Sequence, residues 1–134
     1  MNYSCCESIK TYSDFLNIYA ELSKALLYSN SSKFQMSEKC YLILTNFMHS
    51  NNLDKEKAIK SISNYLKNLQ IVDLKISFEP STDFLEKAYL MIYQYLNKHF
   101  LIKYEVDQSQ FLGATICYDG KIYKGGMEHA FSAG

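Results

Sequence analysis

Four cysteines and three histidines in the chain could act as nucleophiles, proton carriers or metal ligands: Cys5, Cys6, Cys40, Cys117, His49, His99 and His129. Structural zinc sites draw on closely spaced pairs such as C-x-x-C, and the sequence contains none. The histidines are also distant from the cysteines along the chain. We therefore predict no metal site, and we expect buried or reduced thiols, as in a reducing compartment.

Three carboxylates, Glu105, Asp107 and Asp119, fall on one side of a predicted hairpin and could form a general acid–base pair. We interpret them as solvated strand-end charges, because Asp119 already has a structural role in the turn. His99 is explained by the favourable interaction of a cation with a helix C-terminus, and Cys117 by packing in a strand. A small enzyme that uses Cys117 or His99 remains the catalytic alternative.

Motifs for nucleotide, dinucleotide or acyl-transfer chemistry are missing from the sequence, so we predict a protein that is not an enzyme and needs no cofactor. The 14 basic residues are all lysines, and they balance 14 acidic ones to a formal net charge of zero. Phosphate and guanine recognition draws on arginine, so we expect no nucleic-acid partner. No apolar run reaches the ~18 residues of a membrane span and no signal peptide opens the chain, so we expect a soluble protein without membrane insertion.

Residues 1–70 show helical periodicity, and we predict three short amphipathic helices that form a small bundle. The expected N-caps are Thr11 or Ser13, then Ser37, then Asp54. The three predicted apolar stripes contain, in order, Phe15, Leu16, Tyr19, Leu22, Leu26 and Leu27; Tyr41, Leu44, Thr45, Phe47 and Met48; and Ala58, Ile59, Ile62, Tyr65, Leu66 and Leu69.

Residues 71–134 change to a two-residue period and predict the order strand, helix, strand, strand, strand. The helix begins at a capping box formed by Asp83 and Glu86 and buries one stripe, and Asp119-Gly120 marks a hairpin. Gly125-Gly126 is expected to end the last strand. The fold class is therefore α+β, with a helical bundle followed by a small, mostly antiparallel sheet that one helix covers. Each half is small enough to need support from the other or from a partner.

The segment from residue 74 to 127 carries a series of weak motifs. A strand and a helix are followed by Tyr104-Glu105-Val106-Asp107 and then by Phe111-Leu112-Gly113-Ala114. The hairpin Tyr118-Asp119-Gly120-Lys121 and the sequence Lys124-Gly125-Gly126-Met127 complete the series. In this order the segment resembles the C-terminal part of the delta subunit of F-type ATP synthase, whose mitochondrial counterpart is the oligomycin sensitivity-conferral protein.

The resemblance implies a non-catalytic stator subunit, peripheral on the cytoplasmic side of the membrane within a membrane-bound complex. Its motif residues are Asp107, Leu112, Gly113, Asp119, Gly120 and Gly125. It further implies that the helical half holds the N-terminal segments of the alpha subunits of the catalytic head, and that the second half holds the peripheral-stalk (b) helices. We predict head contacts at Leu16, Tyr19 and Leu26, and stalk contacts at Tyr89, Ile92 and Tyr93, where the two tyrosines form a second face of the helix.

The chain departs from the family pattern where Ala114, Lys124 and Gly126 replace a glycine, an aspartate and a serine. The alternative hypothesis is a stand-alone α+β interaction or regulatory module, which would associate with itself through a sheet edge.

Overall fold

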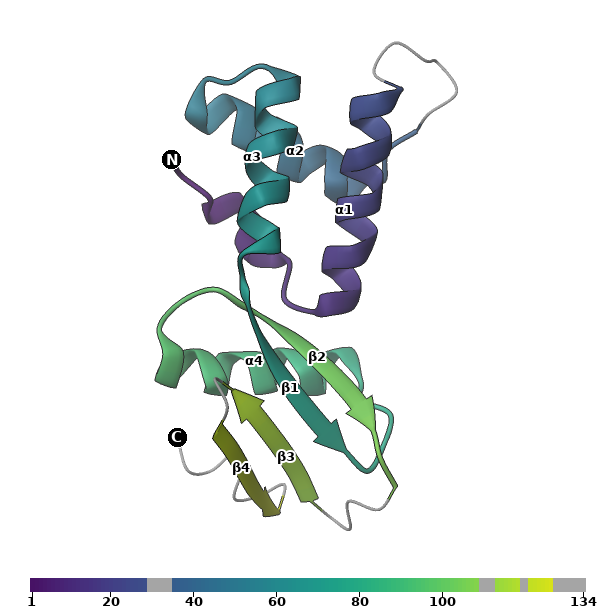
Figure 1. Ribbon diagram of the computed structural model, residues 1–134, viewed down its shortest axis with the longest axis vertical. Helices are drawn as coiled ribbons and strands as arrows, with labels where there is room; N and C mark the ends of the chain where they lie inside the picture. The colour runs from purple at the N-terminus through teal and green to yellow at the C-terminus, as the bar shows by residue number, and fades with distance from the viewer. Residues whose placement is uncertain (29–34, 109–112, 119–120, 127–134) are drawn as a thin grey trace. The chain divides into compact units, whose positions relative to one another are not determined.

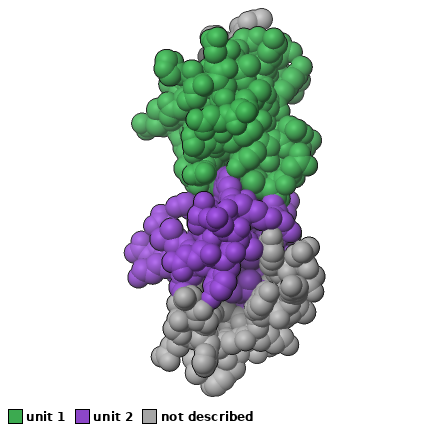
Figure 2. All heavy atoms as spheres, turned by 90° about the vertical axis from the view of Figure 1, so that its left-hand side faces the viewer, with its two compact units in different colours: residues 1–9, 13–69 green, residues 10–12, 70–134 purple. Residues whose placement is uncertain are grey.

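The computed structural model in Figure 1 describes residues 1–28, 35–108, 113–118 and 121–126, with nine helices and strands in the order given below. The chain forms two compact units (Figure 2). The first, here called the helical unit, comprises Met1–Ile9 and Ser13–Leu69, and the second, the sheet unit, comprises Lys10–Tyr12 and Gln70–Gly134. The main division between units therefore falls between residues 69 and 70, one residue from the boundary expected at 70 and 71.

The helical unit contains a 3-10 helix and three α-helices, with bounds η1 Ser4–Ser8, α1 Tyr12–Leu27, α2 Glu38–Asn51 and α3 Lys55–Lys67. The predicted caps of α2 and α3 are confirmed, because the side chain of Ser37 accepts a hydrogen bond from the backbone of Cys40 and that of Asp54 accepts one from Lys57. Asn52 adopts the left-handed conformation with φ 51° and ends α2, as short polar residues do at this position.

The core of the helical unit is lined by one face of each helix. Its buried residues are Ile18, Leu22 and Ala25 from α1, Cys40, Ile43, Leu44 and Phe47 from α2, and Ala58, Ile59, Ile62 and Leu66 from α3. The predicted stripe of α1 was wrong in part: Leu22 is buried as expected, but Leu16, Leu26 and Leu27 are exposed while Ile18 and Ala25 face inward. The predicted stripe of α2 also included Tyr41, which is exposed.

The sheet unit contains four strands and one helix, with bounds β1 Gln70–Ile76, α4 Thr82–Leu96, β2 Phe100–Val106, β3 Gly113–Tyr118 and β4 Lys121–Gly126. The strand order is β2-β1-β3-β4, with β1 parallel to β2 and the other two pairings antiparallel. Parallel neighbours need a long crossover, which α4 provides. The predicted α+β class, with one helix over a mostly antiparallel sheet, is confirmed (Figure 1). Strand β4 includes Gly125 and ends at Gly126, which pairs with Gly113, so the last strand ends at the glycine pair as expected.

Helix α4 starts and ends differently from the prediction. Ser81 is its N-cap and accepts a hydrogen bond from the backbone of Phe84 at 3.1 Å, so the expected capping box of Asp83 and Glu86 was wrong. Asn97 ends the helix in the left-handed conformation, with φ 51°. His99 therefore lies beyond the helix, and the argument that a helix C-terminus explains it fails.

The sheet unit is closed by apolar packing between α4 and one face of the sheet. Its buried cluster is Val72, Leu74, Ile76, Ala88, Tyr89, Phe100 and Ile102. The alternation predicted for β1 is confirmed by its inward residues at 72, 74 and 76. The alternation predicted for β2 was wrong in part, because Phe100, Leu101 and Ile102 are all buried and Val106 is exposed.

A short N-terminal segment completes the outer edge of this sheet. Thr11 forms a parallel bridge with Ile102, whose N–H donates to the carbonyl of Lys10 at 2.8 Å. The ammonium of Lys103 lies 5.0 Å from the centre of the Tyr12 ring, which is within the range of a cation–π contact. Residues 10–12 thus belong to the sheet unit although the chain on both sides of them belongs to the helical unit.

Candidate functional site: a groove between two helices

The thiols of the described residues are poor nucleophiles. Burial raises the pKa of Cys5 and of Cys6 above the ordinary value, and burial together with the nearby Glu21 carboxylate raises the pKa of Cys40 to about 12. A thiol reacts through its thiolate, so a raised pKa lowers the reactive fraction of each of these three at neutral pH. The side chain of Cys117 lies outside the described residues. Within the described part of the chain, no three His, Cys, Asp or Glu side chains gather in a way that could hold a metal ion.

The carboxylates expected to share a hairpin are separated by the strand order. Strand β1 lies between β2, which ends just before Asp107, and β3, which leads to Asp119. Glu105 therefore lies on a strand that does not pair with the predicted hairpin, whose antiparallel strands are β3 and β4. The N–H of Asp107 donates to the carbonyl of Ile76 at 2.7 Å and so prolongs the β1–β2 pairing by one residue. Asp119 lies outside the described residues.

The motif residues of the ATP synthase resemblance fall at the ends of strands. Gly113 begins β3 opposite Gly126, and Gly125 pairs with Ala114. Tyr118 pairs with Lys121, so β3 and β4 are joined by two residues, as a two-residue hairpin requires. The remaining motif residues, Leu112, Asp119 and Gly120, lie outside the described residues.

The predicted stalk contacts are not a free surface, which corrects the expectation for α4. Tyr89 is only 5% exposed and stacks on Phe100, with ring centres 4.3 Å apart and planes 15° apart. Ile92 and Tyr93 pack against the same core cluster. The predicted second face of α4 is therefore the face that seals the sheet, because it carries the aromatic area that the sheet needs to bury.

The predicted head contacts, by contrast, lie at or near the surface of α1. Leu16 is 48% exposed, Leu26 is 37% exposed, and Tyr19 is half-buried. Two of these three residues, Tyr19 and Leu26, line a groove between α1 and α3, whereas Leu16 does not.

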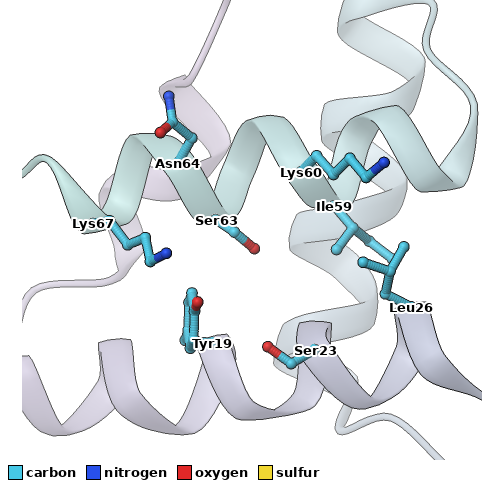
Figure 3. Close-up of a pocket in the computed structure, with 8 residues that line it drawn as sticks. All are labelled: Tyr19, Ser23, Leu26, Ile59, Lys60, Ser63, Asn64 and Lys67. Atoms are coloured by element: carbon cyan, nitrogen blue, oxygen red, sulfur yellow. The ribbon is translucent and has the colours of Figure 1, made fainter.

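The groove has a volume of about 210 Å³ and eight lining residues: Tyr19, Ser23 and Leu26 from α1, and Ile59, Lys60, Ser63, Asn64 and Lys67 from α3 (Figure 3). Those of α1 recur at four and three residues, and those of α3 continue at similar steps, so each set lies along one side of its helix. Tyr19 lies near Lys67 and Leu26 near Ile59, so the two helices run antiparallel along the groove. From Tyr19 to Leu26 the groove spans two helical turns, about 10 Å.

The two ends of the groove differ in chemistry. At one end the ammonium of Lys67 lies 5.4 Å from the centre of the Tyr19 ring, and the hydroxyl of Ser63 points into the same space. At the other end Leu26 and Ile59 lie side by side, and Lys60 extends beside them (Figure 3). Hydroxyl, ammonium and apolar groups in this arrangement are suited to binding a ligand with both polar and apolar parts.

The carboxylates of the two groove helices already have partners. On α1, Glu21 accepts hydrogen bonds from the backbone N–H and the hydroxyl of Ser37, both at 2.7 Å, and Asp14 lies 3.5 Å from the ammonium of Lys39. On α3, Glu56 pairs with Lys60 at 3.0 Å. The lining itself contains two lysines and no acid, so the groove carries positive charge.

Six lining residues were not foreseen from the sequence: Ser23, Ile59, Lys60, Ser63, Asn64 and Lys67. The spacing of Lys60, Ser63, Asn64 and Lys67 is a visible sign that they share a face of α3. No pattern in the sequence, however, indicates that this face lies opposite Tyr19 and Leu26.

Comparison with known proteins gave no match to the chain, whether by family model, by curated sequence or by solved structure. None of the helices in the described residues is long and apolar enough to cross a lipid bilayer.

Proposed function

We propose that the protein is a non-catalytic adaptor that holds partner proteins. The observation that carries this proposal is the open groove between α1 and α3, where Leu26 remains 37% exposed at one end and the ring of Tyr19 is half-buried at the other. Grooves between helices that expose apolar side chains are suited to a partner helix.

Within that class, we propose a stator subunit of a rotary F-type ATP synthase, peripheral on the cytoplasmic side of the membrane. The support is the motif series of residues 104–127 together with the architecture, a helical unit that precedes a strand-helix-strand-strand-strand sheet. In this role the groove takes the N-terminal segment of an alpha subunit of the catalytic head, and the sheet unit meets the stalk helices. Torque is then resisted by two contacts on separate units, with no chemistry in either.

In this role the stalk must contact residues of α4 other than the predicted Tyr89, Ile92 and Tyr93. Tyr89, Ile92 and Tyr93 are engaged with the sheet, whereas Leu90 is 59% exposed. Leu90, together with Tyr95, which is 64% exposed, can therefore be reached by a stalk helix without unfolding the sheet unit.

A tagged copy recovered from its own cells in mild detergent, followed by mass spectrometry, tests the proposal. The expected result is recovery of both head and stalk subunits. Leu26→Asp should lose the head subunits, because it places a charge at the apolar end of the groove. Leu42→Asp is the matched control, since Leu42 is 48% exposed on α2 and does not line the groove.

Recovery of the protein alone, or only with itself, would contradict the stator role and favour the stand-alone interaction module. Equal recovery of head subunits by both variants would contradict the assignment of the head contact to the groove.

A further inference from the structure

We infer that the occupant of the α1–α3 groove is an amphipathic helix that presents a carboxylate to Lys67 and, two turns away, an apolar side chain to Leu26 and Ile59. This inference deepens the adaptor role and rests on it for the existence of a partner. It concerns the chemistry of that partner, which the resemblance does not specify.

Charge is the first argument. The lining holds Lys60 and Lys67 and no acid, and Glu56 offsets only Lys60. Lys67 forms no ion pair with any described residue, and its ammonium is held near the Tyr19 ring instead. A carboxylate placed there gains a cation whose position is already restricted, so less side-chain entropy is lost on binding.

The neighbouring acids do not compete for this place. Both acidic residues of α1 are directed to α2, since Glu21 accepts from Ser37 and Asp14 pairs with Lys39. The carboxylate of Asp54 accepts the backbone N–H of Lys57 at the start of α3, at the end opposite Lys67. These three acids are thus satisfied away from the groove, Glu56 is paired with Lys60, and Lys67 is left for a partner.

Polarity along the groove is the second argument. The hydroxyl of Ser63 points into the space near Lys67, where it could donate to a carboxylate, while Leu26 and Ile59 form the apolar end (Figure 3). The two ends are two helical turns apart, so an acidic and an apolar side chain seven residues apart on a partner helix would meet both.

A displayed library of 18-residue helical peptides, randomised along one face, tests the inference when selected on the full-length protein. On the wild type we expect enrichment of Glu or Asp seven residues from a large apolar residue. Lys67→Glu should abolish that acidic preference or replace it with Lys, because the charge at that end is reversed. Selected peptides should bind Lys67→Glu at least about fivefold more weakly at low salt, and a Glu-to-Lys change in the peptide should restore binding.

Lys24→Glu is the matched control. Lys24 also lies in the last turn of its helix, is exposed and does not line the groove, so both variants change net charge and helix-end electrostatics alike. Its selected peptides should keep the acidic residue. Circular dichroism of the three proteins should show the same helix content, which separates loss of binding from loss of folding.

Three outcomes would overturn the inference: an acidic preference unchanged by Lys67→Glu, no peptide that binds the wild type, or a wild-type dimer in sedimentation that Lys67→Glu dissociates. The last would show that a second copy fills the groove. A different result would contradict the stator role alone: the cells yield no head or stalk subunits, but acidic peptides still bind the groove. The stator role survives without the inference if head subunits bind wild type and Lys67→Glu equally.

Discussion

Helices α1 and α4 are both amphipathic and similar in length, with 16 and 15 residues, yet they use their apolar surface differently. Helix α4 faces a continuous sheet, so Phe84, Leu85, Ile92, Tyr93 and Leu96 all find apolar neighbours there. Helix α1 meets other helices, buries Ile18, Leu22 and Ala25, and leaves Leu16, Leu26 and Leu27 exposed. A sheet covers a broad apolar face, whereas a small bundle leaves one flank of a helix open for a partner.

Removal of the ring at the centre of the sheet unit should cause the largest loss of stability. Phe100 is fully buried and stacks on Tyr89, so Phe100→Ala should lower the free energy of unfolding by about 3–5 kcal/mol through lost burial and a cavity. Urea unfolding followed by circular dichroism measures this change. Leu90→Ala, at an exposed position of α4, should change the stability by less than about 0.5 kcal/mol. Similar losses for the two variants would contradict the closed packing of this unit.

Alkaline pH should weaken the helical unit through Cys40. Its pKa is about 12 in the folded protein, against an ordinary value of 9.0 expected when unfolded. Between these values the unfolded chain loses a proton that the folded chain keeps, so the free energy of unfolding falls as pH rises from 9 to 12 and this contribution is constant below 9. Urea unfolding of wild type and Cys40→Ala at pH 8 and pH 10.5 isolates the effect. An equal fall in both proteins would show that Cys40 is not its source.

Loss of a helix N-cap should lower the stability by a smaller amount, and the loss should differ between the two units. Ser37→Ala removes the hydrogen bond to the backbone of Cys40 and also one to the carboxylate of Glu21 on another helix, whereas Ser81→Ala removes a cap within α4 alone. A cap is worth typically about 1 kcal/mol, so Ser81→Ala should cost that and Ser37→Ala more. Thermal unfolding compares them. If Ser37→Ala costs no more in the wild type than in a Glu21→Gln background, the link between α1 and α2 contributes nothing.

Truncation of a side chain on the exposed flank of α1 should change the stability least. Leu26→Ala should lower the stability by less than about 1 kcal/mol, because Leu26 is 37% exposed. Leu22→Ala, one turn earlier and fully buried, should cost about 2–5 kcal/mol. Urea unfolding of the pair tests whether the two flanks of one helix differ as the structure implies. A large loss for Leu26→Ala would place this residue in the core and leave no apolar flank for a partner.

Local signals predicted much of the fold. Ser37 and Asp54 marked helix starts because a short polar side chain accepts free N–H groups there, and the alternation of β1 revealed its buried face. The buried flank of α1 could not be chosen, because apolar residues occur on more than one side of that helix. Tyr89 was misread for the same reason, since α4 is apolar over a wide arc and only the sheet decides which part is covered.

Long-range pairings were the part that the sequence did not reveal. Strand β1 separates β2 from β3, and a two-residue period contains no information about which strand lies beside which. Two groove residues, Tyr19 and Leu26, were predicted as contacts because they are large and apolar. Lys67 was not, because its proximity to Tyr19 depends on how α3 packs against α1.

The placement of residues 10–12 on the edge of β2 has a consequence for the order in which the protein is made. The carbonyl of Lys10 accepts a hydrogen bond from the N–H of Ile102, which is synthesised 92 residues later. The sheet therefore completes this edge only after β2 has been made. A fragment that starts at residue 70 would leave that edge open to pairing with other chains.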